Sequence, residues 1–183
     1  MIITGKAMKY ENADDVNTDV IWPGKYTYVQ MPASEMKKHA METFDLSFKD
    51  KVVGREILVA GKNFGCGSSR EQASECLKYS GVKAVIAKSF ARIFYRNSIN
   101  IGLPVIESIQ AVESIKDNDS VKVDLEAGML WVGGESVRFP KYPGFVLEIV
   151  KDNGLINHIR KQNGLAPLDP LRPRENASLG VKE

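Results

Sequence analysis

The residues best suited to chemistry lie in one glycine-rich segment, Gly61 to Arg70, which reads G-K-N-F-G-C-G-S-S-R. Glycines let a backbone turn tightly and approach a ligand closely. The adjacent hydroxyls of Ser68 and Ser69 and the guanidinium of Arg70 can donate hydrogen bonds to a carboxylate or a phosphate. A helix that began directly after them would add unpaired backbone N–H groups. The segment therefore predicts an anion-binding loop.

Two familiar phosphate-binding loops do not fit this segment. A P-loop would end in Gly-Lys-Ser or Gly-Lys-Thr, which does not occur here. The dinucleotide fingerprint needs a third glycine where Arg70 stands. What remains is a carboxylate-binding loop, in which Arg70 and Ser69 hold the carboxylate and Ser68 is free for chemistry. The alternative is purely structural: a tight turn in which Ser68 or Ser69 only caps the helix.

The elements around the loop follow an alternation of strands and helices. A buried strand is predicted at 56–60 before the loop, and a helix at about 70–79 after it. A second strand over 82–87, a helix capped by Ser89 and a short strand over 103–106 come next. This alternation implies parallel strand pairing with right-handed crossovers.

The C-terminal third of the chain changes to a meander. Short strands joined by glycine-containing turns are predicted over 121–139, and a further strand over 145–150. Asn153 is placed to cap a last helix over 154–162. Together with an opening strand over 2–10, these elements predict an α/β domain with a mixed sheet and flanking helices.

Composition restricts the class of protein. The 183 residues include 25 basic and 23 acidic side chains and are 43% hydrophobic, which is typical of one soluble globular domain. There is no basic stripe with interleaved aromatics, so no nucleic-acid partner is expected. No apolar run approaches the roughly 20 residues that cross a membrane, and the N-terminus lacks the apolar core of a signal peptide. We expect a cytoplasmic protein with a domain over 1–164 and a tail over 165–183 that is flexible or docks on a partner.

The chain has few candidate metal ligands. Cys66, Cys76, His39 and His158 are too few and too far apart in sequence to hold a metal ion or an iron–sulfur cluster. We therefore expect this chain to bind no metal and no cofactor by itself. Cys66, inside the loop, is either a reactive thiol at a helix N-terminus or a small packing residue. The lack of a nearby thiol or histidine in sequence favours packing.

Several motifs in order resemble the swivelling domain of the aconitase superfamily, in its 3-isopropylmalate dehydratase small-subunit branch. They are N-F-G-C-G-S-S-R-E over 63–71, G-V-K-A-V-I-A-K-S-F-A-R-I-F over 81–94 and N-T-D-V-I-W-P-G-K-Y over 17–26. The segment N-G-L-I-N-H over 153–158 resembles the family's last helix. The resemblance covers about residues 1–163 and implies the β/β/α fold of an aconitase-type swivelling domain.

The resemblance implies that this chain is one of two different subunits that together form an enzyme. In this family a separate large subunit holds a [4Fe–4S] cluster, and the swivelling domain closes over it as part of a heterodimer or heterotetramer. The pair dehydrates and rehydrates a small dicarboxylic hydroxy acid, and so interconverts 3-isopropylmalate and 2-isopropylmalate in leucine biosynthesis. By motif position, Ser68 resembles the catalytic base, and Ser69 and Arg70 resemble the pair that binds a substrate carboxylate.

Two further parts of the resemblance carry expectations about the substrate. Asp19 matches an acidic position near the family's site and is expected to bind the substrate, although a turn residue that caps local N–H groups is an equal alternative. Tyr26, Thr27 and Tyr28 correspond to the loop that contacts the substrate's alkyl group. A bulky Tyr28 would favour methyl-sized groups, so a citraconate or 2,3-dimethylmalate hydratase stays open. A non-catalytic carboxylate-binding module and self-association of the isolated chain also stay open.

Overall fold

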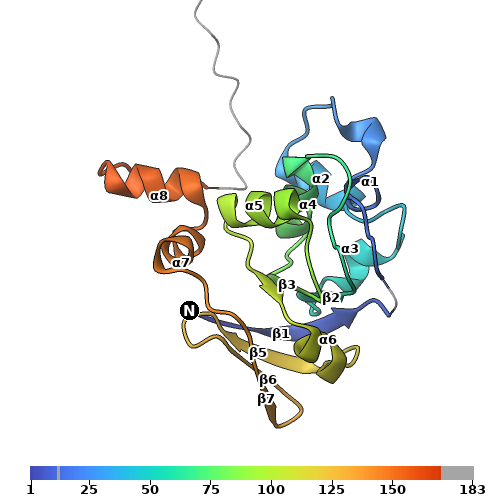
Figure 1. The fold of residues 1–183 in the computed structure, drawn as a ribbon. Coiled ribbons are helices and arrows are strands. Elements are labelled where there is room, and N and C mark those ends of the chain that lie inside the picture. The colour runs from blue at the N-terminus through green and yellow to red at the C-terminus, as the bar shows by residue number, and fades with distance from the viewer. Residues whose placement is uncertain (12, 170–183) are drawn as a thin grey trace, which may run out of the picture.

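A computed structural model describes residues 1–11 and 13–169 as a seven-stranded sheet with helices around it (Figure 1). In chain order the strands are β1 Ile2–Lys9, β2 Ile57–Ala60, β3 Ala84–Ala87, β4 Val105–Glu107, β5 Ser120–Asp124, β6 Met129–Val132 and β7 Glu135–Arg138. Their order across the sheet is β4-β3-β2-β1-β5-β6-β7. The expected α/β class with a mixed sheet is confirmed.

The strand β1 joins two halves of the sheet that differ in direction. Its residues Ala7–Lys9 pair in parallel with β2, and its residues Ile2–Lys6 pair antiparallel with β5. The strands β2, β3 and β4 continue the parallel half, whereas β5, β6 and β7 form an antiparallel meander. The parallel pairing predicted for the alternating strands and the meander predicted for the C-terminal third are both confirmed. The carboxyl ends of the parallel strands meet at one edge, where ligands bind in open α/β sheets.

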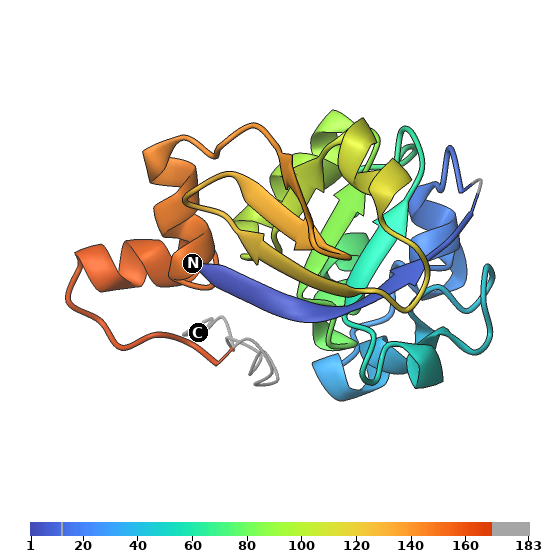
Figure 2. The same cartoon turned by 90° about the horizontal axis from the view of Figure 1, so that it is seen from below.

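Helices cover the parallel half. They are α1 Thr18–Ile21, the 3₁₀ turn η1 Gly24–Tyr26, α2 Ala33–His39, α3 Phe48–Lys51, α4 Glu71–Tyr79, α5 Arg92–Asn100, α6 Ile109–Ser114, α7 Gly144–Lys151 and α8 Leu155–Gln162. The helix α4 packs between α2 and α5, and α6 contacts β3 and β7. Figure 2 shows α7 and α8 at the end of the molecule where β1 begins.

Burial follows the two kinds of pairing. Every residue of β2 and β3 is buried, as expected for parallel strands that are covered on both faces. In β5, Val121 and Val123 are buried while Ser120 and Lys122 face solvent, the alternation of a sheet with one wet face. The hydrophobic core therefore includes both halves of the sheet, and it encloses the parallel strands on both of their faces.

The strand expected over Phe145–Val150 is wrong, because this stretch belongs to the helix α7. A short apolar run fits either a buried strand or a helix, and periodicity alone does not separate them. Pro143 precedes the helix in an extended conformation, where its missing N–H costs nothing. Val150 is buried and Phe145 is 70% exposed, so the run has one buried side, which the helix packs against α5.

Two predicted helix caps are also wrong. The helix α5 begins at Arg92, and the Ser89 hydroxyl accepts instead from the Asn63 backbone N–H at 2.8 Å. Asn153 adopts a left-handed backbone, and its side chain accepts from Lys78 Nζ at 2.6 Å. Both side chains connect segments that are far apart in sequence, which a local motif does not reveal.

The boundary predicted after residue 164 falls close to a short docked segment. The Leu168 N–H donates to Asn157 Oδ1 at 2.7 Å, and Asn157 Nδ2 donates to the Leu168 carbonyl at 3.1 Å. The start of the predicted tail is thereby tied to α8. Residues 170–183 of that tail lie outside the described residues.

Candidate active site

The glycine-rich loop leaves the carboxyl end of β2 and enters α4, beside the segment that follows β1. The Gly65 N–H donates to the Val16 carbonyl at 2.7 Å, and the Thr18 N–H donates to the Cys66 carbonyl at 2.7 Å. Asn17 and Cys66 form an isolated parallel bridge. These contacts hold the loop and the segment before α1 as one unit at the carboxyl edge of the sheet.

The other side of the loop is fixed to the segment that follows β3. The Phe64 N–H donates to the Ser89 carbonyl at 3.0 Å, and the Ala91 N–H donates to the Phe64 carbonyl at 3.0 Å. The Phe64 ring is fully buried and meets the Phe94 ring edge-on at 5.3 Å. The loops that follow three neighbouring parallel strands therefore meet at this site.

Two glycines in the loop have backbones that other residues rarely adopt. Gly65 has φ of +78°, and a Cβ atom there would lie 2.2 Å from Cγ of Phe94. Gly67 has φ of +91°, and its nearest neighbour would be Thr18 Oγ1 at 3.4 Å. Gly65 is thus required by both space and backbone, whereas Gly67 is required by backbone alone.

The two serines present their hydroxyls to solvent. Ser68 and Ser69 are exposed, and neither hydroxyl has a hydrogen-bond partner among the described residues. The Ser68 carbonyl, in contrast, accepts from the Arg70 N–H at 2.9 Å and from Thr18 Oγ1 at 3.0 Å. The backbone of Ser68 is therefore fixed while its hydroxyl stays free for a ligand.

Thr18 is the residue that sequence reasoning missed as a support of the site. It is 2% exposed, and its hydroxyl reaches the carbonyl of the candidate base. A threonine beside an acidic residue gives no sign of burial by itself. The available signal was its place in the N-T-D run over 17–19, which matches a family motif.

Arg70 is brought together with Asp19, as the resemblance leads one to expect for two residues of one site. Its Nη1 forms an ion pair with Asp19 Oδ1 and lies 3.5 Å from the carbonyl oxygen of Trp22. The Arg70 side chain is 17% exposed and that of Asp19 is 51% exposed. The guanidinium is thus held at the rim of the loop rather than extended into solvent.

The segment expected to contact the alkyl group of the substrate lies next to Arg70, but its three residues, Tyr26, Thr27 and Tyr28, have different surroundings. The Tyr26 ring packs against Trp22 at 5.4 Å and against His39 at 4.3 Å. The Thr27 hydroxyl is buried without a described partner, and its carbonyl accepts from Gln72 Nε2 at 3.5 Å. Tyr28 is 97% exposed, so in the isolated chain it lines no closed pocket.

The electrostatics of the loop favour the binding of an anion and make the Cys66 thiol unreactive. The helix α4 begins at Glu71, directly after the two serines and Arg70, so its unpaired N–H groups add a partial positive charge there. Burial raises the pKa of the Cys66 thiol, and the nearby Asp15 charge adds to this effect. A thiol with a raised pKa is a poor nucleophile, which supports the packing interpretation.

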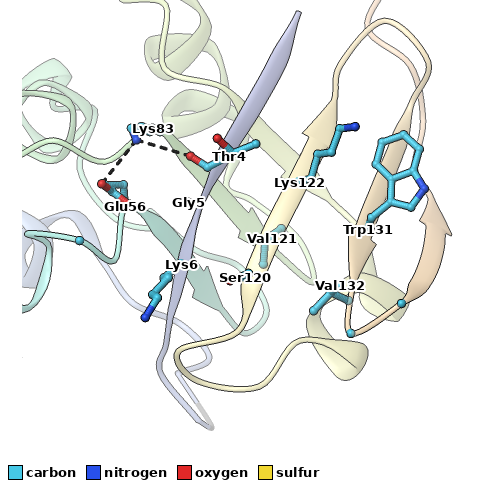
Figure 3. A pocket seen from close by; sticks show the side chains of 13 residues that line it. Thr4, Gly5, Lys6, Glu56, Lys83, Ser120, Val121, Lys122, Trp131 and Val132 are labelled. Carbon is cyan, nitrogen blue, oxygen red and sulfur yellow. Dashed lines mark hydrogen bonds and ion pairs between the residues drawn. The ribbon is translucent and has the colours of Figure 1, made fainter.

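A separate hollow of about 520 Å³ lies away from the loop. Figure 3 shows Lys6, Lys122 and Trp131 on the wet face of the sheet, and Glu56 beside Lys83. Glu56 and Lys83 precede β2 and β3, so this hollow is at the amino ends of the parallel strands, opposite the loop. The hollow is therefore separate from the serines and Arg70.

A family model now accounts for this arrangement. The model of the aconitase C-terminal domain matches residues 4–110, a span that holds the four parallel strands and the loop. The chain belongs to the aconitase C-terminal domain family. It also has relatives named 3-isopropylmalate dehydratase small subunit. One from Caldanaerobacter subterraneus is 48% identical over 160 residues, which are 86% of this chain and 98% of the relative.

Other members of the family match as closely. The 3-isopropylmalate dehydratase small subunit of Caldicellulosiruptor bescii is 49% identical over 162 residues, covering 87% of this chain and 96% of the relative. The crystal structure of 3-isopropylmalate dehydratase from Methanocaldococcus jannaschii superimposes with a TM-score of 0.80 at 45% identity, covering 89% of this chain and 96% of that chain. The aconitase-type swivelling fold expected from the motifs is confirmed.

No group of three or more His, Cys, Asp and Glu side chains among the described residues is placed to hold a metal ion. No helix in the same part of the chain is long and apolar enough to cross a membrane.

Proposed function

We propose that this chain is the small subunit of a 3-isopropylmalate dehydratase, which interconverts 3-isopropylmalate and 2-isopropylmalate in leucine biosynthesis. The observation that carries the proposal is the pair of exposed serines, Ser68 and Ser69, followed by Arg70 at the carboxyl edge of the sheet. The chain is 45–49% identical to small subunits of that name over about 160 residues. The names of these relatives favour isopropylmalate over citraconate or 2,3-dimethylmalate. The cytoplasm is the compartment we expect for such an enzyme.

We assign the removal of a proton to Ser68. The proton leaves the carbon next to a substrate carboxylate, and a neutral hydroxyl is too weak a base for this step. The helix α4 begins three residues after Ser68, so its positive end would stabilise negative charge on the Ser68 oxygen, and Arg70 adds a positive charge to the same loop. The Ser68 backbone is held through its carbonyl, which accepts from Thr18 Oγ1 and from the Arg70 N–H. The lone pairs of the Ser68 hydroxyl oxygen therefore stay available for the reaction.

We assign one substrate carboxylate to Ser69 and Arg70. An arginine can hold a carboxylate with two parallel N–H donors, which fixes its orientation as well as its position. The Ser69 hydroxyl has no described partner and is one residue away. Tyr26, Thr27 and Tyr28 would border the alkyl group, with the exposed Tyr28 ring available to either the substrate or the partner.

The rest of the site would come from a large subunit. The described residues offer no ligand set for an iron–sulfur cluster, so no step is assigned to one here. A cluster on the partner would supply Lewis-acid assistance to the departing hydroxyl. This chain would contribute the base, the carboxylate receptor and a lid that excludes water.

The test is reconstitution with the cluster-bearing large subunit. Turnover of 2-isopropylmalate, citramalate and 2,3-dimethylmalate is followed separately through the absorbance of the alkene. We expect the isopropyl substrate to have the highest kcat/KM, and no turnover of any of the three would refute the proposal. Ser68→Ala should lower kcat by about 10²- to 10⁴-fold, the usual loss for a general base. Ser136→Ala on β7, far from the loop, is the matched control.

A further inference from the structure

The Arg70 guanidinium is already occupied on one side before any substrate is present. Its Nη1 carries both described contacts, the ion pair with Asp19 Oδ1 and the approach to the Trp22 carbonyl. No hydrogen bond joins Nε or Nη2 to any described residue. The donors of the edge formed by Nε and Nη2 are therefore not used within the described residues, and a carboxylate bound there would adopt one of the two bidentate geometries of arginine.

The position of Asp19 is set by the same loop that carries Arg70. Asp19 is the second residue of α1, whose N-cap Asn17 accepts from the Val20 N–H through its side chain. Thr18, the preceding residue, is fixed to the loop through its N–H and its hydroxyl. The backbone that carries the Asp19 carboxylate is thus held beside the loop.

The backbone of Gly24 lies beside the pair. A Cβ atom there would lie 3.1 Å from Asp19 Oδ1 and 3.7 Å from Arg70 Nη2. The ion pair is therefore bordered by α1, by the start of η1 and by the loop. Three segments of the chain define the direction of one guanidinium.

We infer that Asp19 is a positioning residue that orients Arg70 toward the substrate carboxylate, and that it does not bind the substrate itself. A carboxylate repels the negatively charged substrate groups, so direct binding by Asp19 would be unfavourable. A long arginine side chain that is fixed beforehand loses less conformational entropy when the ligand arrives. The inference deepens the proposed function, and its kinetic test rests on that function.

The first measurement uses the isolated chain and needs no large subunit. In ¹⁵N NMR of arginine side chains, the guanidinium of Arg70 should rotate slowly about its Nε–Cζ bond because Nη1 is held. The variant Asp19→Ala should make this rotation fast, whereas Asp50→Asn, an exposed aspartate of α3, should leave it unchanged. Fast rotation in the unsubstituted chain would overturn the inference whatever the enzyme's activity.

The second measurement uses the reconstituted enzyme with 2-isopropylmalate. We expect Asp19→Ala to raise KM about tenfold with kcat changed less than about twofold, since a tenfold change is about 1.4 kcal/mol, close to the lower end of what one charged hydrogen bond contributes. Asp19→Asn should have a smaller effect, because its amide oxygen still accepts from Nη1. In an Arg70→Lys background, Asp19→Ala should add nothing further, since the group that it orients is gone.

Three kinetic outcomes would overturn the inference. A lower KM in Asp19→Ala would mean that Asp19 competes with the substrate for Arg70. Additive effects in the double variant would mean that the two residues act independently. A fall in kcat at constant KM would assign Asp19 to the reaction step. If the unsubstituted pair of subunits turns over no isopropylmalate, the proposed function fails, and the NMR measurement alone then decides the role of Asp19.

Discussion

Replacing Gly65 by alanine should destabilise the whole domain through one buried contact. The left-handed backbone at φ +78° costs a residue with a Cβ about 1–2 kcal/mol. The new Cβ would lie 2.2 Å from Cγ of Phe94, which is 1% exposed and packed against Phe64. Moving such a ring costs about 1–3 kcal/mol, the range for overpacked cores. We expect the free energy of unfolding to fall by about 2–5 kcal/mol.

Urea denaturation followed by circular dichroism measures this loss. The matched control is Gly133→Ala, because Gly133 also has a positive φ, +57°, but no atom lies within 4 Å of its Cβ position. In Gly133→Ala, the free energy of unfolding should fall only by the cost of the left-handed backbone. A third variant, Gly65→Ala with Phe94→Leu, should lose less than the two single changes together. If Gly65→Ala costs no more than Gly133→Ala, the steric argument for the loop is incorrect.

Three other predictions concern side chains that connect the segments of the fold. Burial lowers the pKa of Lys78 in the folded chain to about 8, from the ordinary lysine value of 10.5. Between these two pH values the unfolded chain therefore keeps a proton on Lys78 that the folded chain has lost. The free energy of unfolding should rise across that window by up to about 3 kcal/mol, relative to Lys78→Met, in urea titrations at each pH. Although burial alone would raise the pKa of Asp45, hydrogen bonds from Lys51 and neighbouring groups hold it well below its usual range. Its stabilisation is complete above about pH 4 and is lost at lower pH, so Asp45→Asn should differ from the unsubstituted chain less at pH 2 than at pH 6 in thermal unfolding. Thr18→Val removes the hydrogen bond to the Ser68 carbonyl and should lower kcat of the reconstituted enzyme about three- to tenfold with little change in the melting temperature, as expected for about 1 kcal/mol. An unchanged kcat would remove Thr18 from the support of the site.

Local patterns were sufficient for the parallel half of the fold. The apolar runs at 57–60 and 84–87 can only be buried on both faces, and the glycine-rich loop between the first run and α4 marks the carboxyl edge of the sheet. The motif with Ser68 and Arg70 located the candidate site for the same reason: a glycine-rich turn before a helix has few other arrangements. The roles of these two residues are still a prediction.

Tertiary contacts decided what local patterns could not. The run at 145–150 forms α7, which packs against α5, a contact that the sequence does not display. Asn153 carries a typical cap side chain, but a lysine from α4 binds it. The pairing of Asp19 with Arg70 joins residues 51 positions apart, and it depends on the tertiary contacts that join residues 16–18 to the loop.

The dual pairing of β1 has a consequence for the order in which the chain folds during synthesis. All strands of the parallel half are complete by residue 107, whereas the antiparallel partner of Ile2–Lys6 is made only at 120–124. Until then the first half of β1 is an unpaired edge with open backbone N–H and C=O groups, the feature that recruits other chains. A nascent or truncated chain that ends near 114 would therefore expose an aggregation-prone edge strand at its N-terminus. In the full chain this edge is paired with β5, the first strand of the meander.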